Sequence, residues 1–439
     1  MVYVKTSEKS ICIVGTGYVG MASAIGFAAL GHRVTGYDIL PERIAGLQRG
    51  VTPYREAGID AALAAHLASG TIRFHDDLAV AARDAEFIII CVGTPAGADG
   101  SSDLSYVRAA VEAVGRVRKS GSVVVLRSTV PAGTTDRLAA ETGLDFVYAP
   151  EFLREGSAVA DFLDPDRIVV GACSNEAAMR YAALLSELER PIVITSYKNA
   201  ELIKGYSNAF LALKISFANE VANMCDAVDA DAHEVLAGVG HDRRIGPAFL
   251  RPGIGFGGPC FEKDVKSLYH QAGRHGIGRE LLGATLRVND SQPRRIVDML
   301  QDELGGLDGV HVAIWGLAFK AGTDDVRDSL ALRIIDDLHR RGARMTAYDP
   351  SVTSLGHDSP CALAPNELAA LEGADALLVL TEWPDFLKVH PRAIAGRLRR
   401  RVMIDGRNLF DPNTVAESGI TYRGVGRKPD GDLRLAAVS

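Results

Sequence analysis

The sequence predicts an α/β protein with two doubly wound sheets joined by a central all-α region that contains a long helix. In the first part of the chain, short β-branched runs alternate with amphipathic helical stretches. The alternation stops from about Lys198 to Leu300 and returns after about Gly309. A chain of 439 residues is too long to fold around one ordinary hydrophobic core. We therefore expect three domains, residues 1–197, 198–308 and 309–439.

The first region contains six apolar runs with strand character and three helical patterns between them. Strand, helix and strand in succession imply right-handed crossovers, and therefore a parallel sheet covered on both faces. The expected strands are Ser10–Val14, Arg33–Tyr37, Phe87–Cys91, Val123–Arg127, Phe146–Tyr148 and Ile168–Val170. The expected helices are Gly20–Ala29, Pro41–Arg49 and Tyr106–Val117.

The later regions follow the same reasoning. The segment NAELIKGYSNAFLALKISFANEVANMCDAV, residues 199–228, predicts the long central helix. In the last region, strand-like runs alternate again with a helical pattern over Leu330–Arg340. The runs are HVAIWGLAF, ARMTAYDP, DALLVLT and RVMIDG.

Composition narrows the class of protein. The chain is 47% hydrophobic and 23% charged, with a net charge of −7 and no long Lys/Arg block, which argues against a nucleic-acid partner. Six scattered cysteines without a C-x-x-C pattern argue against disulfides and metal ligation, so we expect no metal and a reducing, cytoplasmic location. The uncharged run over residues 11–30 has the length of a membrane span, but its glycines favour a buried strand and helix.

The hexapeptide Gly15-Thr16-Gly17-Tyr18-Val19-Gly20 predicts a dinucleotide site. It follows an apolar strand and precedes a helix, so the first glycine permits the turn, the second admits a pyrophosphate and the third lets helix pack on strand. Asp38 ends the next expected strand, where a carboxylate accepts ribose hydroxyls and repels a 2′-phosphate. We therefore expect NAD rather than NADP, with Arg43 close enough to shift that preference.

Two threonines follow strands of the same expected sheet. Thr94 and Thr129 lie just past the carboxyl ends of their strands, where ligands bind in open α/β sheets. The alternative for a threonine in such a place is a helix cap.

A lone thiol stands in the stretch GFGGPCFEKD, residues 255–264. Glycines and Pro259 shape the approach to Cys260, and a helix starting there would place Asp264 on the same face. A helix N-terminus and the ammonium group of Lys263 would both stabilise a thiolate. A nucleophilic thiol beside NAD can oxidise an aldehyde through a hemithioacetal and a thioester. The alternative is a buried cysteine near a helix cap.

Longer motifs make the chain resemble the nucleotide-sugar 6-dehydrogenase family, which contains the UDP-glucose and GDP-mannose dehydrogenases. The resemblance runs from GTGYVG to DGRNLF, over nearly the whole length, and implies two Rossmann-like domains around the helical one. The motifs are PEFLREG (150–156), ELIKGYSNAF (201–210), DRRIG (242–246), PGIGFGGPCFEKD (252–264) and WGLAFKAGTDDVRDS (315–329).

The resemblance implies oxidation of the sugar C6 alcohol to a carboxylate with two NAD⁺ in turn, and it assigns roles to individual residues. Cys260 would be the nucleophile, Lys204 and Asn208 would stabilise the alkoxide and oxyanions, and Glu151 would be the base for thioester hydrolysis. Asp264, with Thr129, would hold a water or relay a proton. For the cofactor, the resemblance adds Tyr18, Val19, Glu155, Lys263 and Arg327 to Gly15, Gly17, Gly20, Asp38, Arg43, Thr94 and Thr129. For the sugar nucleotide, it implies Glu151, Phe152, Leu153, Lys204, Asn208, Phe249, Gly253, Gly257, Lys320, Arg407 and, across a homodimer interface, Arg244.

This chain departs from the family pattern at a few places. Pro259 and Glu262 stand where the family loop more often has serine and proline, and an inward-pointing Glu262 should raise the pKa of the thiol. The R-x-S-P pattern of the family reads Arg327-Asp328-Ser329-Leu330 here, with leucine in place of proline at the start of the expected helix.

Several functions remain open at this stage. The motifs favour UDP-glucose, whereas dTDP-glucose differs by one methyl group, which a hydrophobic site distinguishes poorly; GDP-mannose is a further substrate. A catalytically inactive sensor of NAD or nucleotide sugars would not need the thiol. A two-electron alcohol dehydrogenase would stop at the aldehyde.

Overall fold

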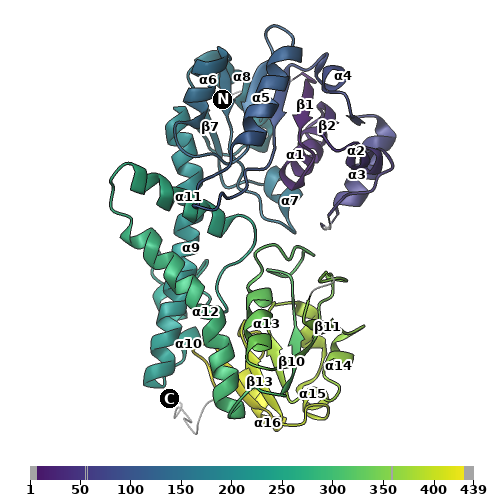
Figure 1. Cartoon of the computed structure of the whole chain (residues 1–439). Coiled ribbons are helices and arrows are strands. Elements are labelled where there is room, and N and C mark those ends of the chain that lie inside the picture. The colour runs from purple at the N-terminus through teal and green to yellow at the C-terminus, as the bar shows by residue number, and fades with distance from the viewer. Residues whose placement is uncertain (1–6, 55, 57, 357–358, 430–439) are drawn as a thin grey trace, which may run out of the picture. The chain divides into compact units, whose positions relative to one another are not determined.

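The computed structural model describes residues 7–54, 56, 58–356 and 359–429 (Figure 1). The chain forms two compact units. The first consists of Met1–Ser207 and Lys266–Ile277, and the second of Asn208–Val265 and Gly278–Ser439.

An eight-stranded sheet is the centre of the first unit, with strand order β3-β2-β1-β4-β5-β6-β7-β8. Strands β1 to β6 are parallel, as expected for a doubly wound sheet. The strands are β1 (Ser10–Val14), β2 (Arg33–Tyr37), β3 (Ile72–His75), β4 (Phe87–Ile90), β5 (Val123–Leu126), β6 (Phe146–Tyr148), β7 (Ile168–Ala172) and β8 (Ile192–Thr195).

The prediction that all strands of this sheet are parallel was wrong at β7. Strand β7 pairs with β6 in antiparallel orientation, and β8 runs parallel to β7. The connection from β6 to β7 contains the short helix α7 (Ala158–Leu163), whose Phe162 packs against Phe27 and Gly26 of α1 (Tyr18–Ala29). Strand β7 therefore begins at the end of the sheet where β6 ends, without the crossover that a parallel strand would need.

Both faces of the first sheet are covered by apolar layers. Alternate side chains of β1 point to opposite faces, so Ile11 and Ile13 belong to one buried cluster and Cys12 and Val14 to the other. The remaining helices of this unit before α9 are α2 (Pro41–Gln48), α3 (Ile59–Ser69), α4 (Leu78–Ala82), α5 (Ser105–Val117), α6 (Thr134–Thr142) and α8 (Asn175–Leu184).

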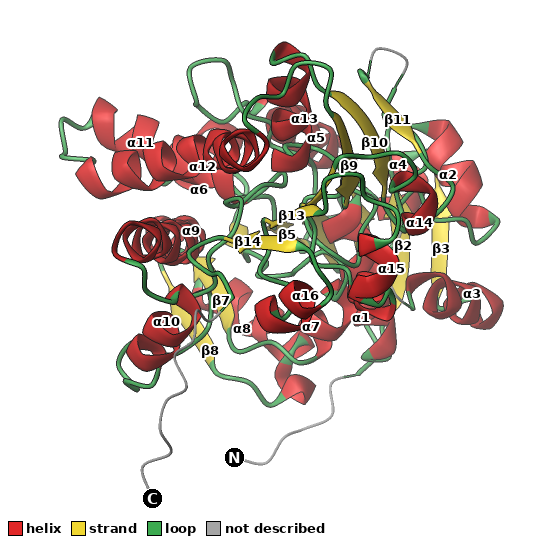
Figure 2. Cartoon of the chain, turned by 90° about the horizontal axis from the view of Figure 1, so that it is seen from below, coloured by secondary structure: helices red, strands yellow, loops and turns green. Residues whose placement is uncertain are grey.

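A six-stranded parallel sheet lies in the second unit, with order β11-β10-β9-β12-β13-β14. Its order repeats that of β1 to β6, and Figure 2 shows its strands in yellow among red helices. The strands are β9 (His311–Trp315), β10 (Arg344–Tyr348), β11 (Cys361–Leu363), β12 (Ala376–Val379), β13 (Val402–Asp405) and β14 (Thr421–Gly424). The helices are α13 (Leu330–Arg340), α14 (Glu367–Ala370), α15 (Pro391–Ala395) and α16 (Pro412–Glu417).

The first turn is built in the same way in both sheets. The N–H of Gly15 donates to the carbonyl of Tyr37 at 2.8 Å, and the N–H of Gly316 donates to the carbonyl of Tyr348 at 2.8 Å. The two Rossmann-like sheets expected from the sequence are therefore confirmed, although they are not close sequence repeats.

Long helices make up the region between the two sheets in sequence. They are α9 (Tyr197–Val228), α10 (Ala232–Gly240), α11 (Phe261–Arg274) and α12 (Glu280–Leu304). The second half of α9 shares a core cluster with α12, in which the small side chains of Ala218 and Ala222 allow close packing against Ile296 and Leu300. The long central helix is therefore confirmed.

The uncharged run over residues 11–30 folds as β1 and α1. Within the described residues, every helix is too short or too polar to cross a membrane.

Candidate active site

The glycine loop after β1 combines a tight turn with open space next to its backbone. Gly15 has φ +91°, a conformation that favours glycine. A Cβ on Gly20 would lie 1.9 Å from the carbonyl oxygen of Gly15, whereas a Cβ on Gly17 would meet nothing within 4 Å. Gly20 is therefore required for packing, and the open side of Gly17 leaves room for a pyrophosphate at the N-terminus of α1. These residues fit a dinucleotide.

Asp38 ends β2 beside this loop and is almost completely buried. Its Oδ2 accepts hydrogen bonds from the Thr16 N–H at 2.8 Å and the Thr16 hydroxyl at 3.0 Å, and it pairs with Arg43 Nη1 at 3.0 Å. Burial by itself would raise the pKa of Asp38, but hydrogen bonds from Thr16 and Leu40 and the charge of Arg43 lower it below the usual value. The carboxylate of Asp38 is therefore ionised, at the position where it would accept hydrogen bonds from the ribose hydroxyls of a bound dinucleotide.

The Asp38–Arg43 pair leads to a prediction about cofactor choice. Asp38→Ser should increase kcat/KM for NADP⁺ relative to NAD⁺ about ten- to a hundredfold, because a carboxylate that repels a 2′-phosphate is lost and Arg43 is released to bind it. Initial rates with both cofactors measure the ratio. Asp38→Ser/Arg43→Ala should lose the gain. An unchanged ratio in Asp38→Ser would show that this carboxylate does not select the cofactor.

The two threonines at strand ends contact each other. The Thr94 hydroxyl donates to the carbonyl of Thr129 at 2.9 Å. Because α5 begins only at Ser105, Thr94 is not a helix cap. This hydrogen bond joins the loops that follow β4 and β5, at the edge of the sheet where ligands bind.

Glu151 and Lys204 form a buried ion pair in the first unit. Lys204 Nζ lies 3.0 Å from Glu151 Oε1, and the two side chains are only 5% and 10% exposed. The other carboxylate oxygen accepts the N–H of Leu153 at 2.7 Å, and Lys204 Nζ lies 5.4 Å from the ring centroid of Phe152. Four residues that the sequence assigned to the site from two separate motifs are therefore in contact.

Tyr18 connects the glycine loop to the PEFLREG segment. Its hydroxyl donates to the carbonyl of Arg154 at 2.7 Å, next to Glu155. Glu56, which the sequence analysis missed, accepts the N–H groups of Gly156 at 3.0 Å and Ala158 at 2.5 Å. Burial and the hydrogen bond with Glu56 raise the pKa of Tyr18. No motif marks Glu56, so the sequence offered no signal for it.

Glu201 is a second residue that the sequence analysis missed. From α9, its carboxylate accepts the N–H of Gly133 at 2.6 Å, the N–H of Thr135 at 2.8 Å and the Thr135 hydroxyl at 2.7 Å. Burial raises its pKa above the usual value. Glu201 thus ties the turn after Thr129 to the helix that carries Lys204. Its spacing of three residues from Lys204 was the available signal.

Cys260 is exposed and stands at the start of α11 in the second unit. Its carbonyl accepts the N–H of Asp264 at 2.9 Å, the first hydrogen bond of the helix. The prediction of a helix beginning at this thiol is confirmed. Asp264 is buried, where it accepts from Asn208 Nδ2 at 2.7 Å and pairs with Lys263 Nζ at 2.6 Å.

The glycines before the thiol have a packing reason. A Cβ on Gly253 would lie 2.9 Å from the carbonyl of Gly406, one on Gly257 would lie 2.6 Å from that of Asp328, and one on Gly258 would lie 2.7 Å from the Phe319 ring. The loop therefore lies against segments that follow strands of the second sheet. Phe249, at the start of this region, has φ +63°, a strained conformation for a side chain of this size.

Arg407, one of the basic residues assigned to the sugar nucleotide, is held by two backbone carbonyls. Its Nε donates to the carbonyl of Leu380 at 2.8 Å, and its Nη2 donates to that of Phe319 at 3.2 Å. Asp405, which the sequence analysis missed, accepts the Arg407 N–H at 3.1 Å, and complete burial raises the pKa of Asp405 to about 6. Lys320 Nζ lies 5.6 Å from the Phe319 ring centroid.

Two further assigned arginines are exposed and each is paired with a nearby aspartate. Arg327 forms an ion pair with Asp325, and Arg244 forms one with Asp242. Ser329, two residues after Arg327, caps α13 by accepting the N–H of Ala331. The departure from the family pattern at this point therefore leaves the helix start intact.

The fold and these sites define a dinucleotide-dependent dehydrogenase with a second Rossmann-like domain. Three domain models of one family match the chain, namely the NAD binding domain over residues 9–192, the central domain over 198–291 and the UDP binding domain over 313–412. The chain belongs to the UDP-glucose/GDP-mannose dehydrogenase family. The resemblance and the choice of NAD expected from the sequence are confirmed.

Relatives match over nearly the full length. The UDP-glucose 6-dehydrogenase of Pseudomonas aeruginosa is 38% identical, over 98% of this chain and 100% of the relative. That of Rhizobium meliloti is 39% identical, over 96% and 100%. The solved structure of a UDP-glucose dehydrogenase from the archaeon Pyrobaculum islandicum is 38% identical with a TM-score of 0.88, and covers 96% of this chain and 98% of its own.

Proposed function

We propose that this protein is an NAD-dependent UDP-glucose 6-dehydrogenase, which oxidises the C6 alcohol of UDP-glucose to the carboxylate of UDP-glucuronate. The observation that carries the proposal is the similarity, over nearly the whole of both chains, to proteins named UDP-glucose 6-dehydrogenase. The residues that this chemistry requires are all present, namely Cys260, Lys204, Asn208, Asp264 and Glu151.

The domain boundaries form part of the same proposal. Residues 1–197 would bind the dinucleotide, 198–308 would supply the thiol and the dimer contact, and 309–439 would bind the sugar nucleotide. Each of the three matched segments falls within one of these ranges.

Lys204 and Cys260 act in the oxidation steps. The bound dinucleotide supplies the hydride acceptor for both oxidations. The ammonium group of Lys204 stabilises the alkoxide that forms when the C6 hydroxyl loses its proton. The sulfur of Cys260 then forms a bond to the aldehyde carbon and holds it as a hemithioacetal, and after the second oxidation as a thioester. Asn208 donates an amide hydrogen bond to the oxyanion.

Glu151 and Asp264 act on protons. Glu151 is a carboxylate fixed by Lys204 and by the Leu153 N–H, so it can take a proton from the water that attacks the thioester. The new C–O bond forms as the C–S bond breaks, and Cys260 leaves as a thiolate while Glu151 holds the proton taken from the water. Asp264, held by Asn208 and Lys263, holds a water or relays the proton released in the first oxidation.

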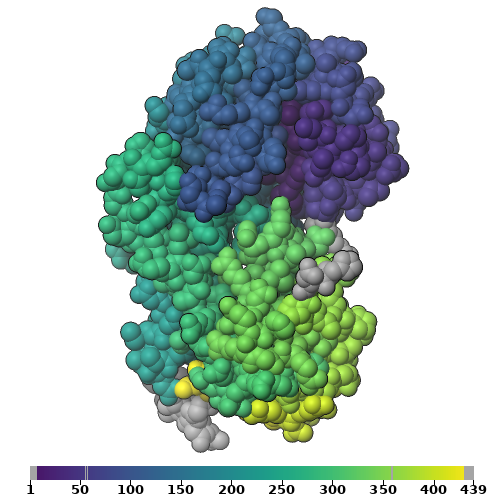
Figure 3. Space-filling model, in the orientation of Figure 1, coloured from purple at the N-terminus to yellow at the C-terminus, as the bar shows by residue number. Residues whose placement is uncertain are grey.

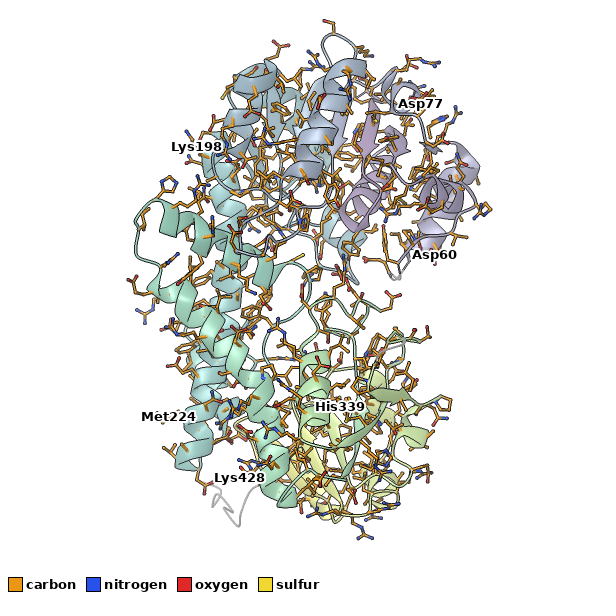
Figure 4. The ribbon with its side chains drawn as sticks, in the orientation of Figure 1. Asp60, Asp77, Lys198, Met224, His339 and Lys428 are labelled. Carbon is orange, nitrogen blue, oxygen red and sulfur yellow. The ribbon has the colours of Figure 1, made fainter. Side chains whose placement is uncertain are left out.

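We further propose a homodimer that buries one face of α9. Five large apolar side chains on this helix are 47–62% exposed and recur at intervals of four and seven residues, a pattern typical of a helix–helix interface. They are Tyr206, Phe210, Phe217, Met224 and Val228. Met224 projects outward from α9 in Figure 4, and the teal atoms of the second half of α9 reach the surface in Figure 3.

Charges on this face should separate the subunits. Phe210→Glu/Met224→Glu should convert the dimer to a monomer, because two buried carboxylates without partners cost several kcal/mol. Light scattering after gel filtration measures the mass. Tyr106→Glu, a control at an exposed aromatic position on α5, should leave the mass unchanged. A double variant that elutes with the wild-type mass would exclude α9 as the interface.

A substrate panel tests the proposed function. Purified protein is incubated with UDP-glucose, dTDP-glucose or GDP-mannose and NAD⁺, while NADH and the product mass are recorded. We expect two NADH per UDP-glucose and a product with the mass of the uronic acid. Preference for another sugar nucleotide would correct the substrate. Absence of turnover on all three would favour a sensor. The cytoplasmic location expected from the scattered cysteines belongs to the same proposal.

A further inference from the structure

The thiol stands at the end of a segment without regular structure. Residues 251–259, all described by the structure, form neither helix nor strand, and α11 begins directly after Cys260. A nucleophile must be held within about 0.5 Å of its productive position. Side chains from other elements of the second unit must therefore fix this turn.

Asn289 of α12 fixes the chain four residues before the thiol. Its Oδ1 accepts the N–H of Phe256 at 2.7 Å, and its Nδ2 donates to the carbonyl of Phe256 at 3.0 Å. The side chain is 1% exposed, and a Cβ on Gly255 would lie 2.5 Å from its oxygen. One buried amide thus satisfies both backbone groups of Phe256, as a neighbouring strand would.

Glu262 fixes the chain two residues after the thiol. Its buried carboxylate pairs with Arg333 Nη2 of α13 at 2.7 Å. Arg333 Nη1 in turn lies 3.4 Å from Oδ1 of Asp290, the residue after Asn289 on α12. The chain on both sides of the thiol is therefore connected to two adjacent residues of α12, Asn289 directly and Asp290 through Arg333. The arginine also balances the carboxylate that this loop has in place of the more common proline.

We propose that Asn289 and the Glu262–Arg333 pair are positioning residues for Cys260. They hold the thiol turn from both sides, and Arg333 neutralises the charge of Glu262 two residues after Cys260. The inference rests on the proposed function in that Cys260 is the nucleophile. Loss of Arg333 alone leaves a buried, uncompensated carboxylate two residues from the thiol, and a negative charge at that range disfavours the thiolate. Loss of both partners removes that charge.

Alkylation of the thiol tests this proposal without any substrate. Iodoacetamide is added at neutral pH, and mass spectrometry of the peptide that contains Cys260 follows the reaction. Arg333→Met should slow alkylation about three- to tenfold. Arg333→Lys should keep most of the wild-type rate, and Glu262→Gln/Arg333→Met should recover it. Arg340→Met, a matched loss of an exposed arginine on α13, should change nothing.

The outcomes separate the two proposals. A wild-type alkylation rate in Arg333→Met, or no recovery in the double variant, would overturn the positioning role even if the enzyme oxidises UDP-glucose. Asn289→Ala adds a second measurement, since kcat should fall at least about tenfold with KM changed less than about threefold. A rise in KM of that size with kcat unchanged would instead contradict the positioning role of Asn289. Circular dichroism confirms that each variant is folded.

Discussion

Cys260→Ser should stop the reaction before the acid forms, with at most one NADH released per site and a steady-state rate reduced at least about a thousandfold. A serine hydroxyl is a far weaker nucleophile than a thiolate at the N-terminus of a helix, so the corresponding hemiacetal and ester cannot form at a useful rate. Rapid mixing with UDP-glucose and NAD⁺ measures NADH per site, and mass spectrometry detects any retained intermediate.

The exposed Cys173 provides the control for this experiment. Cys173→Ser removes an exposed thiol outside the proposed site and should leave two NADH per sugar and the wild-type rate. Undiminished production of two NADH per sugar by Cys260→Ser would exclude the covalent route. An aldehyde as the only product of the wild-type protein would instead favour a two-electron alcohol dehydrogenase.

Lys204→Met should reduce both activity and stability. Activity should fall about a hundred- to a thousandfold, because the cation that stabilises the alkoxide and oxyanions is lost. Unfolding free energy should fall by about 3–5 kcal/mol, because Glu151 is left buried without its partner. Initial rates and urea denaturation measure the two effects separately.

A double variant distinguishes the two roles of Lys204. Lys204→Met/Glu151→Gln should regain most of the stability, since the unpaired charge is gone, but it should regain no activity. Lys198→Met, at an exposed position of the same helix (Figure 4), should change unfolding free energy by less than about 1 kcal/mol. Wild-type kcat in Lys204→Met would contradict the proposed mechanism.

The fold could be predicted from the sequence where local signals are strong. The glycine turn, Asp38 at the end of β2 and the long pattern of α9 were all recognisable, because each depends on residues close together in the chain. Four strands were missed, namely β3 (IRFH), β8 (IVIT), β11 (CAL) and β14 (TYRG). Each is an edge strand of its sheet and is only three or four residues long, so its apolar pattern in the sequence is weak.

In the candidate site, too, local sequence signals identified residues but not their contacts. The family motifs named Lys204, Glu151, Asn208 and Asp264, but they could not show which charge pairs with which. The partners Glu201 and Asp405 carry ordinary signals in the sequence, and their importance lies in burial and in the backbone groups that they bind. The orientation of Glu262 was an open question that Arg333, 71 residues further along the chain, answers.

The sequence by itself determined the class of fold, the cofactor and the residues that we propose for the chemistry, because glycine turns, hydrophobic periodicity and long motifs act over short distances in the chain. Only the tertiary structure decided the antiparallel entry of β7, the burial of the Lys204–Glu151 pair and the support of the thiol turn by Asn289 and Arg333. Those contacts join residues far apart in sequence, and their strength depends on exclusion of water, which no local pattern encodes.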